Sequence, residues 1–202
     1  MPGPSVGCLA PGLLPIPIMD AIDILTNEHR LIGRVLDALV GFAGKVRSGP
    51  APDERAELGR FVTFIREFAD EHHHAKEEDM LFAALVEHGF PAHAGPIAVM
   101  LAEHEEGRVL VRRLRDRAGS GAAWGAAQRE GVLSSAHAYA DLLRAHIHGE
   151  DGILFPMARQ HLPPEAMAVV AEACARADRE HAERGVELVA LAGELTRAHG
   201  SG

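Results

Sequence analysis

The sequence predicts an all-α protein: an up-down-up-down four-helix bundle with an additional C-terminal helix. Past residue 19 there is almost no strand signal, and apolar residues recur at spacings of three and four, the period of an amphipathic helix. Four long stretches of this kind are joined by short links, which favour antiparallel neighbours. Only 9 of the 202 residues are aromatic, so the core is expected to be mostly aliphatic side chains and alanine.

The first helix is expected over residues 20–47, with apolar positions at Ile22, Leu25, Ile32, Leu36 and Leu39. The segment "SGPAPDE" ends this helix and opens a second one, because proline and acidic residues suit a helix N-terminus. The second helix is expected to run to about residue 88, where "HGFP" supplies a glycine just past the end and then a proline.

Three further helices are expected over residues 93–118, 122–161 and 163–199. The segment "AGSG" separates the first two of them, and "LPPE" opens the last. Pro156 is expected to bend the helix over 122–161, because proline removes a backbone donor inside a helix.

These helices divide the chain into a disordered N-terminal arm (1–19), the bundle (20–161) and a C-terminal helix packed on the bundle (162–202). The arm has no Lys or Arg and contains five prolines, so it resembles neither a secretory signal nor a transit peptide. Met19 directly precedes the first helical pattern, and an over-extended start is therefore one explanation for the arm.

The composition excludes several classes of function. Lys and Arg number 20 and Asp and Glu 29, and the resulting net charge of −9 excludes broad nucleic-acid binding by charge. The basic run "RVLVRRLRDR" (108–117) is a local exception, which we interpret as a solvated helix face rather than a nucleic-acid patch. Cys8 and Cys174 lie far apart, which fits a reducing compartment, and no apolar run approaches the roughly 20 residues of a membrane span. We expect a cytoplasmic protein.

The chain contains an internal repeat. "HHHAKEEDMLF" at 72–82 and "HIHGEDGILFP" at 146–156 align at an offset of 73, which sets one HxxxE element on another. Glu28-His29 aligns with Glu103-His104 at an offset of 75. The sequence pattern therefore indicates that one helix pair is duplicated, and a bundle with a pseudo-two-fold axis is expected.

The repeated residues carry metal-binding chemistry. Residues four apart on an α-helix project from one face, so each HxxxE element presents an imidazole beside a carboxylate. With these faces inward, six groups meet inside the bundle: His29, His73, Glu77, His104, His146 and Glu150. Such groups are costly to bury unless they are paired or bind a cation. Nitrogen and oxygen ligands from four helices exceed the needs of one tetrahedral zinc, so we expect two cations, with iron preferred over manganese or zinc.

The order H…HxxxE…H…HxxxE, carried by "HHHAKEEDMLF", "GPIAVMLAEHEEGR" and "HIHGEDGILFP", resembles the hemerythrin-like HHE cation-binding family over about residues 20–160. The resemblance implies a hemerythrin-like four-helix bundle with two non-heme iron ions (Fe2+/Fe3+), oxo- or hydroxo-bridged in one form, that meet O2 or related small molecules. It also implies a seventh ligand beside the histidine of the second helix, and His74 occupies that place.

The first half of the repeat offers an alternative pair one residue further on, His74 with Glu78. The repeat favours His73 with Glu77, because the alternative pair aligns with Ile147 and Asp151.

The third helix departs from the pattern of oxygen carriers. Oxygen-carrying hemerythrins look as though they use an HxxxH pair there and a later aspartate. Here the residue four positions after His104 is Arg108 rather than a histidine, and Glu150 replaces the aspartate. These two differences argue against reversible O2 carriage.

The other polar residues have simpler interpretations. Glu28 and Glu103 are either exposed or accept a hydrogen bond that orients an imidazole, and both options stay open. Tyr139 is expected to pack in the core, and Glu180-His181 to be an exposed pair. Surface or hydrogen-bonded positions are expected for His88, His93, His137, His148, His161 and His199.

Three classes of function are compatible with these features. The favoured one is a non-heme di-iron protein that binds or senses O2, NO or H2O2. The alternatives are a di-iron enzyme with catalase-like or NO-reducing activity, and an iron-handling protein whose site orders the bundle.

Overall fold

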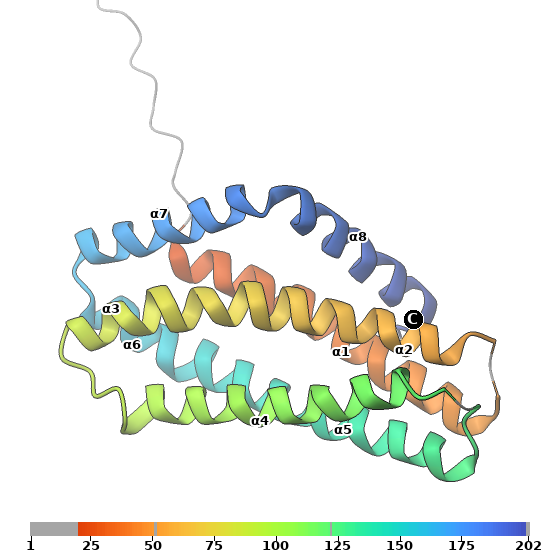
Figure 1. Ribbon diagram of the computed structural model, residues 1–202. Helices are drawn as coiled ribbons and strands as arrows, with labels where there is room; N and C mark the ends of the chain where they lie inside the picture. The colour runs from red at the N-terminus through yellow and green to blue at the C-terminus, as the bar shows by residue number, and fades with distance from the viewer. Residues whose placement is uncertain (1–19, 51, 122, 201–202) are drawn as a thin grey trace, which may run out of the picture.

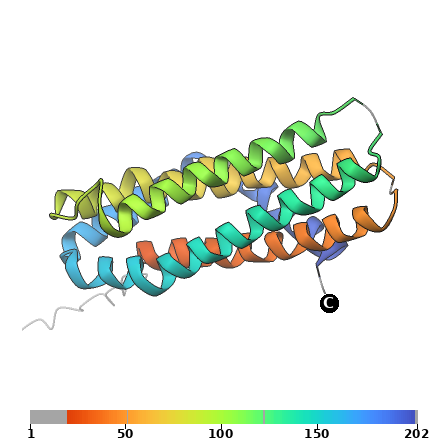
Figure 2. The same cartoon turned by 90° about the horizontal axis from the view of Figure 1, so that it is seen from below.

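The computed structural model describes residues 20–200 except 51 and 122, and the expected N-terminal arm (1–19) lies outside the described residues. Four helical rods form an antiparallel bundle, and two further helices cross one side of it (Figure 1, Figure 2). No strand occurs among the described residues, as the sequence predicts. None of the helices in this part of the chain has both the length and the apolar character that a bilayer span requires.

The first and third rods are single α-helices. The first rod is α1 (Ala21–Ser48), which begins after Asp20, whose Oδ1 accepts a hydrogen bond from the Ile22 N–H at 3.1 Å. This is the ordinary N-cap arrangement, and it satisfies one of the free donors of the first turn. The third rod is α4 (Gly95–Ala118), with a proline in its first turn.

The second rod (54–87) changes its hydrogen bonding along its length. It consists of α2 (Glu54–Phe64), the π-helical segments η1 (Ile65–His74) and η2 (Glu77–Phe82), and α3 (Ala83–Glu87). π-Helical turns bond residue i to residue i+5 and are often found at functional sites. The rod ends as predicted, with Gly89 in the left-handed region at φ +95°.

The fourth rod (126–161) repeats this design. It consists of α5 (Ala126–Gly149), the π-helical segment η3 (Glu150–Leu154) and α6 (Phe155–His161). Pro156 lies in the first turn of α6, directly after η3, where its missing N–H falls at the junction between the two kinds of helix.

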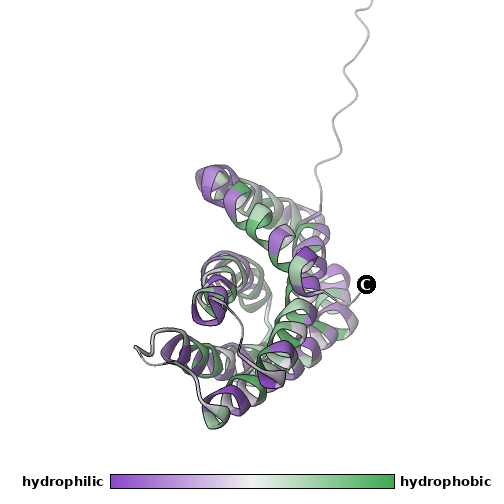
Figure 3. Ribbon diagram, turned by 90° about the vertical axis from the view of Figure 1, so that its right-hand side faces the viewer, coloured by the Kyte–Doolittle hydropathy of each residue, from purple (hydrophilic) through white to green (hydrophobic). Residues whose placement is uncertain are grey.

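The C-terminal region differs from the expectation of a single helix over 163–199. It forms two helices, α7 (Pro164–Glu180) and α8 (Ala182–His199), separated at His181, whose φ of −110° and ψ of 18° leave the α-helical region. Both pack on α1; α7 also reaches η2, and α8 reaches α2 and η1. Seen end-on, the pair lies outside the bundle along one side (Figure 3). The break lets α8 change direction and follow α1. The boundary between 20–161 and 162–202 stays a prediction.

A buried lysine ties α7 to the bundle. Lys76 is 1% exposed, and its Nζ donates to Glu28 of α1 and to Asp178 of α7. A buried ammonium is tolerated only when anions surround it, so these two carboxylates make the docking of α7 specific.

Two apolar clusters make up the core. Members of the first include Leu36, Phe61, Leu114, Ala136 and Leu195, and members of the second include Leu25, Leu81, Met100, Leu154 and Val170. Along each of the four rods, buried residues of one cluster are separated from buried residues of the other by about two to three turns. Polar side chains fill that interval on all four rods, and they form the site described below.

α8 approaches α1 closely at Gly41. A Cβ built on this glycine would lie 2.3 Å from the carbonyl oxygen of His199, closer than real Cβ atoms come to backbone. The same substitution at Gly44, one turn further along α1, meets nothing within 4 Å. The lack of a side chain at Gly41 therefore sets how near the two helices lie.

We expect Gly41→Ala to destabilise the protein and Gly44→Ala to stabilise it. Alanine at Gly44 gains about 0.5–1 kcal/mol of helix propensity, whereas alanine at Gly41 pushes α8 away from α1 at a cost of about 1–3 kcal/mol. Urea denaturation followed by circular dichroism measures both free energies of unfolding. If Gly41→Ala is as stable as Gly44→Ala, the close packing of α8 on α1 is wrong.

Candidate metal centre

The seven residues selected from the sequence lie together in the polar layer between the two apolar clusters. All four rods contribute, and each of the seven residues is at most 4% exposed. The residues are His29 of α1, His73 and His74 of η1, Glu77 of η2, His104 of α4, His146 of α5 and Glu150 of η3.

The seven residues divide into two groups that share one glutamate. His29, His73, Glu77 and Glu150 form one group, and His74, Glu77, His104 and His146 form the other. Within each group, one ligand atom per residue lies within 4.8 Å of every other, a spacing compatible with one cation. Because Glu77 belongs to both groups, its carboxylate is placed to bridge two neighbouring cations.

The two oxygens of Glu77 face opposite groups. Oε1 lies 3.2 Å from His73 Nε2 and 3.6 Å from His29 Nε2, while Oε2 lies 3.5 Å from His104 Nε2.

Glu150 occupies the matching place on the other side. Its Oε2 lies 3.2 Å from both His29 Nε2 and His146 Nε2. His146 Nε2 is in turn 3.0 Å from His104 Nε2. Both glutamates are therefore in positions from which a carboxylate can contact two cations.

Five of the donor atoms at the centre have no hydrogen-bond partner among the described residues. Both carboxylate oxygens of Glu77 and of Glu150 and the Nε2 of His29 are buried and make no hydrogen bond among the described residues. An unpaired buried carboxylate costs several kcal/mol. A metal cation in contact with these oxygens removes that cost, so the donor set fits cations rather than a purely structural polar cluster.

The Nδ1 of each imidazole, on the side away from the centre, contacts a carboxylate. Four contacts are short: His29 Nδ1 to Asp151 (2.9 Å), His73 Nδ1 to Glu28 (2.8 Å), His104 Nδ1 to Glu78 (2.7 Å) and His146 Nδ1 to Glu103 (2.9 Å). His74 Nδ1 makes a longer one of 3.4 Å to Asp70. With Nδ1–H donating to a carboxylate, Nε2 is the free lone pair, and it faces the centre in the tautomer that metal binding needs.

The four short contacts form a closed ring around the bundle. Glu28 of the first rod orients a histidine of the second, and Glu78 of the second orients the histidine of the third. Glu103 of the third orients the histidine of the fourth, and Asp151 of the fourth orients His29 of the first. The ring obeys the pseudo-two-fold relation of the sequence repeat, and we refer to it as the carboxylate ring.

The charges of the centre favour bound cations. Burial lowers the pKa of His29, but the carboxylates of Asp151, Glu150 and Glu77 more than offset this and raise it to about 11. Burial also lowers the pKa of His73, but the carboxylates of Glu77 and Glu28 more than offset this and raise it to about 9. Burial raises the pKa of Glu77, but His73 and His29 bring it well below its usual value. The two central glutamates therefore attract positive charge into the bundle interior.

His74 breaks the symmetry of the repeat. Its ring stacks on that of His104, with centroids 3.8 Å apart, and burial lowers its pKa to about 4, so it is a neutral imidazole. The position that matches it in the second half is Ile147. The group with His104 and His146 thus has three histidines, and the group with His29 and His73 has two.

The apolar clusters close the layer on both sides. Phe155 stacks on His29 with centroids 5.4 Å apart, and Phe82, its counterpart in the repeat, stacks on His104 at 6.1 Å. Both phenylalanines are buried in the second apolar cluster. They keep water from one side of the centre and restrict the rotation of the rings.

Reasoning from sequence missed three of the orienting carboxylates. Glu28 and Glu103 had been left open and now have their role, but Glu78 was considered only as an alternative ligand. Asp151 was noted only as its counterpart in the repeat, and Asp70 was not selected. The signal that could have found Glu78 and Asp151 is their alignment at offset 73, each directly after a central glutamate.

The remaining selected residues lie outside the centre. Tyr139 is buried, as expected, and Arg108 makes ion pairs with Asp70, Glu78 and Glu105. His199 is half-buried, with Nε2 2.8 Å from Glu57. Exposed positions are occupied by His88, His93, His137, His148, His161 and His181.

The fold and the donor set can be compared with known proteins. The family model of the hemerythrin HHE cation binding domain matches residues 20–158. The chain belongs to the hemerythrin family. The match includes residues of all four rods and every residue of the centre, and α7 and α8 of this hemerythrin-family protein follow the matched segment.

One curated relative of this hemerythrin-family protein is an iron-sulfur cluster repair protein, DnrN, of Neisseria gonorrhoeae. It is 34% identical over 141 residues, which cover 65% of this chain and 85% of the relative. No solved structure matches the chain.

We expect the carboxylate ring to control metal affinity. Asp151→Asn and Glu103→Gln keep the shape of each side chain but remove the negative charge behind His29 or His146, so each should weaken binding about 10- to 100-fold. Glu106→Gln is the matched control, because Glu106 is exposed on the same helix as Glu103 and makes no ion pair among the described residues. Competition with a chromogenic ferrous chelator measures the affinity. Unchanged affinity in both ring variants would contradict the role of the ring.

Proposed function

We propose that this hemerythrin-family protein holds two non-heme iron ions between its four rods and uses them to bind or sense a reactive small molecule: O2, NO or H2O2. The observation that carries the proposal is the shared glutamate between two groups of buried donors, with both of its oxygens otherwise unpaired. His29 and His73 would hold one ion and His74, His104 and His146 the other, with Glu77 and Glu150 between them. When bound, iron supplies the affinity for such ligands and the redox chemistry.

The donor set supports iron over other metals. It offers imidazole nitrogens and carboxylate oxygens without a thiolate, a set that suits iron or manganese. Cys174, the cysteine among the described residues, lies elsewhere, with its Sγ 3.7 Å from Met80. A structural zinc site would normally be closed by four ligands, often including thiolates.

The number of donors leaves room for an external ligand. Five imidazole nitrogens and four carboxylate oxygens make nine donors, whereas two six-coordinate ions have roughly twelve positions. About three positions are then available for water or a small molecule. The apolar clusters on both sides suit small neutral ligands such as O2 and NO better than large polar substrates.

Arg108 separates this protein from reversible oxygen carriers. It stands where the resemblance places a further histidine of the third helix, and its guanidinium is paired with Asp70 and Glu78. A paired arginine cannot serve as a metal ligand. We therefore propose sensing or reaction, rather than transport, as the outcome of ligand binding.

The first experiment combines metal content with ligand binding. We expect about two irons per chain by mass spectrometry in protein purified without a His tag, and an optical change that saturates on anaerobic titration with NO. His146→Ala should lose iron and the optical change. His148→Ala, two residues further along the same helix with an exposed side chain, should keep both. A single zinc per chain, or no optical response to NO, O2 or H2O2, would contradict the proposal.

A second candidate is iron supply during repair of iron-sulfur clusters, favoured by the similarity to the iron-sulfur cluster repair protein of Neisseria gonorrhoeae. This function requires that iron leaves the centre. Burial of all seven donors opposes release from the closed bundle, so the bundle would have to open.

Iron release separates the two candidates. If the protein supplies iron, a ferrous chelator or an apo iron-sulfur protein should remove both ions from the intact protein within minutes. If both ions stay bound for hours and the protein responds to NO, the result would support the small-molecule function and contradict iron supply. The iron transferred is measured by the colour of the ferrous chelate.

A further inference from the structure

We propose that a cavity between η1 and α4, next to His74, binds a small inorganic oxyanion. The proposal goes beyond the function proposed above, because it concerns a cavity beside the metal centre whose proposed anion donors, Arg112 and Tyr139, are not metal ligands. It would stand even if the metal centre carried out neither of the candidate functions.

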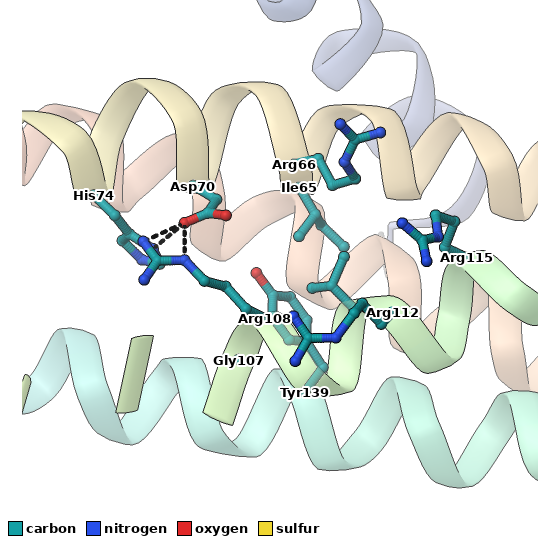
Figure 4. A pocket seen from close by; sticks show the side chains of 10 residues that line it. Ile65, Arg66, Asp70, His74, Gly107, Arg108, Arg112, Arg115 and Tyr139 are labelled. Atoms are coloured by element: carbon teal, nitrogen blue, oxygen red, sulfur yellow. Dashed lines mark hydrogen bonds and ion pairs between the residues drawn. The ribbon is translucent and has the colours of Figure 1, made fainter. Parts of the chain in front are cut away.

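The cavity has a volume of about 190 Å³ and reaches from the surface to His74 (Figure 4). Since one water occupies about 30 Å³ in the liquid, the cavity has room for an anion of three or four heavy atoms with some water. The polar residues of its wall are Arg66, Asp70, His74, Arg108, Arg112, Arg115 and Tyr139.

Arginines make up most of the charged residues of the cavity wall. Four arginines line it against a single carboxylate, that of Asp70. Three of these arginines have carboxylate partners: Arg66 pairs with Glu71, Arg108 with Asp70, and Arg115 with Asp116. Arg112 makes no ion pair with any described residue, and its guanidinium borders the cavity (Figure 4).

Helical spacing explains why the arginines meet there. Arg108, Arg112 and Arg115 stand at positions i, i+4 and i+7 of α4, which is one face of a helix. The basic run 108–117 was interpreted from the sequence as a solvated face. Arg112, Arg113 and Arg115 are indeed exposed, and Arg112 and Arg115 also line the cavity, while Arg113 lies outside it.

Tyr139 supplies an unused donor on the inner wall. Its side chain is 2% exposed, and its hydroxyl makes no hydrogen bond with the described part of the chain. Figure 4 shows the hydroxyl directed into the space between η1 and α4. Burial raises the pKa of Tyr139, and Asp70 raises it further, so the phenol is neutral and can only donate to an anion.

These groups match an oxyanion rather than another ligand. A guanidinium forms two parallel hydrogen bonds to a planar oxyanion, and a neutral phenol can donate a third. An apolar ligand would leave Tyr139 and Arg112 without partners, and a metal cation would be repelled by four arginines. A hydroxyl on the cavity wall with no protein partner, beside a guanidinium with no ion pair, is therefore best satisfied by a small anion.

The test measures nitrate binding to the full-length, iron-loaded protein by isothermal titration calorimetry at low ionic strength. Nitrate is planar, inert to reduction under these conditions and a poor ligand for iron, so it reports on the cavity. We expect one site per chain. Arg112→Gln and Tyr139→Phe should each weaken binding about tenfold or more, because each removes a hydrogen bond to a charged ligand.

Arg113→Gln is the matched control, since Arg113 is exposed on the same helix and lies outside this cavity. It should bind nitrate like the unmodified protein. Arg112 is exposed, and Tyr139→Phe removes a hydroxyl without a partner, so neither change should lower the melting temperature. Equal affinity in all four proteins, or no binding at millimolar nitrate, would overturn the proposal. Equal affinity would also be the result if nitrate bound at the iron.

Discussion

Two carboxylates in the interior of a helical bundle impose the main constraint on this structure. Glu77 and Glu150 are 0% exposed, and their four oxygens have no hydrogen-bond partner among the described residues. Such groups would destabilise an ordinary bundle by several kcal/mol. The surrounding imidazoles, each held by a carboxylate behind it, make sense only if positive charge sits between the glutamates. The polar layer is thus a binding site that the rest of the bundle supports.

The apolar clusters provide that support. They lie on either side of the polar layer along every rod, so the bundle keeps a continuous core above and below the site. Stability comes from these clusters, whereas the layer between them contributes function at an energetic cost. Lys76 links this layer to α7. Its ammonium donates to Glu28, which orients His73, and also to Asp178 of α7.

Much of the fold and of the buried candidate site could be predicted because the repeat supplies the pattern twice. His73 and Glu77 are supported by His146 and Glu150, and helix ends such as Gly89 follow from local chemistry. His74 was reached only through the family resemblance, because ideal α-helical geometry separates adjacent side chains by about 100°. The wider π-helical turns of η1 reduce that separation. No glycine or proline at His181 marks the break between α7 and α8 in the sequence. The break instead accompanies the packing of both helices on α1.

The carboxylate ring has a consequence for the order of events during biosynthesis. Each of its contacts joins neighbouring rods, and the last one, from Asp151 to His29, joins the end of the domain to its beginning. On the ribosome, the first two rods emerge with His29 not yet oriented and with no second glutamate nearby. Both groups of donors draw on residues from either side of position 100. A completed centre is therefore a late product of synthesis, and a truncated nascent chain has little capacity to capture a metal ion.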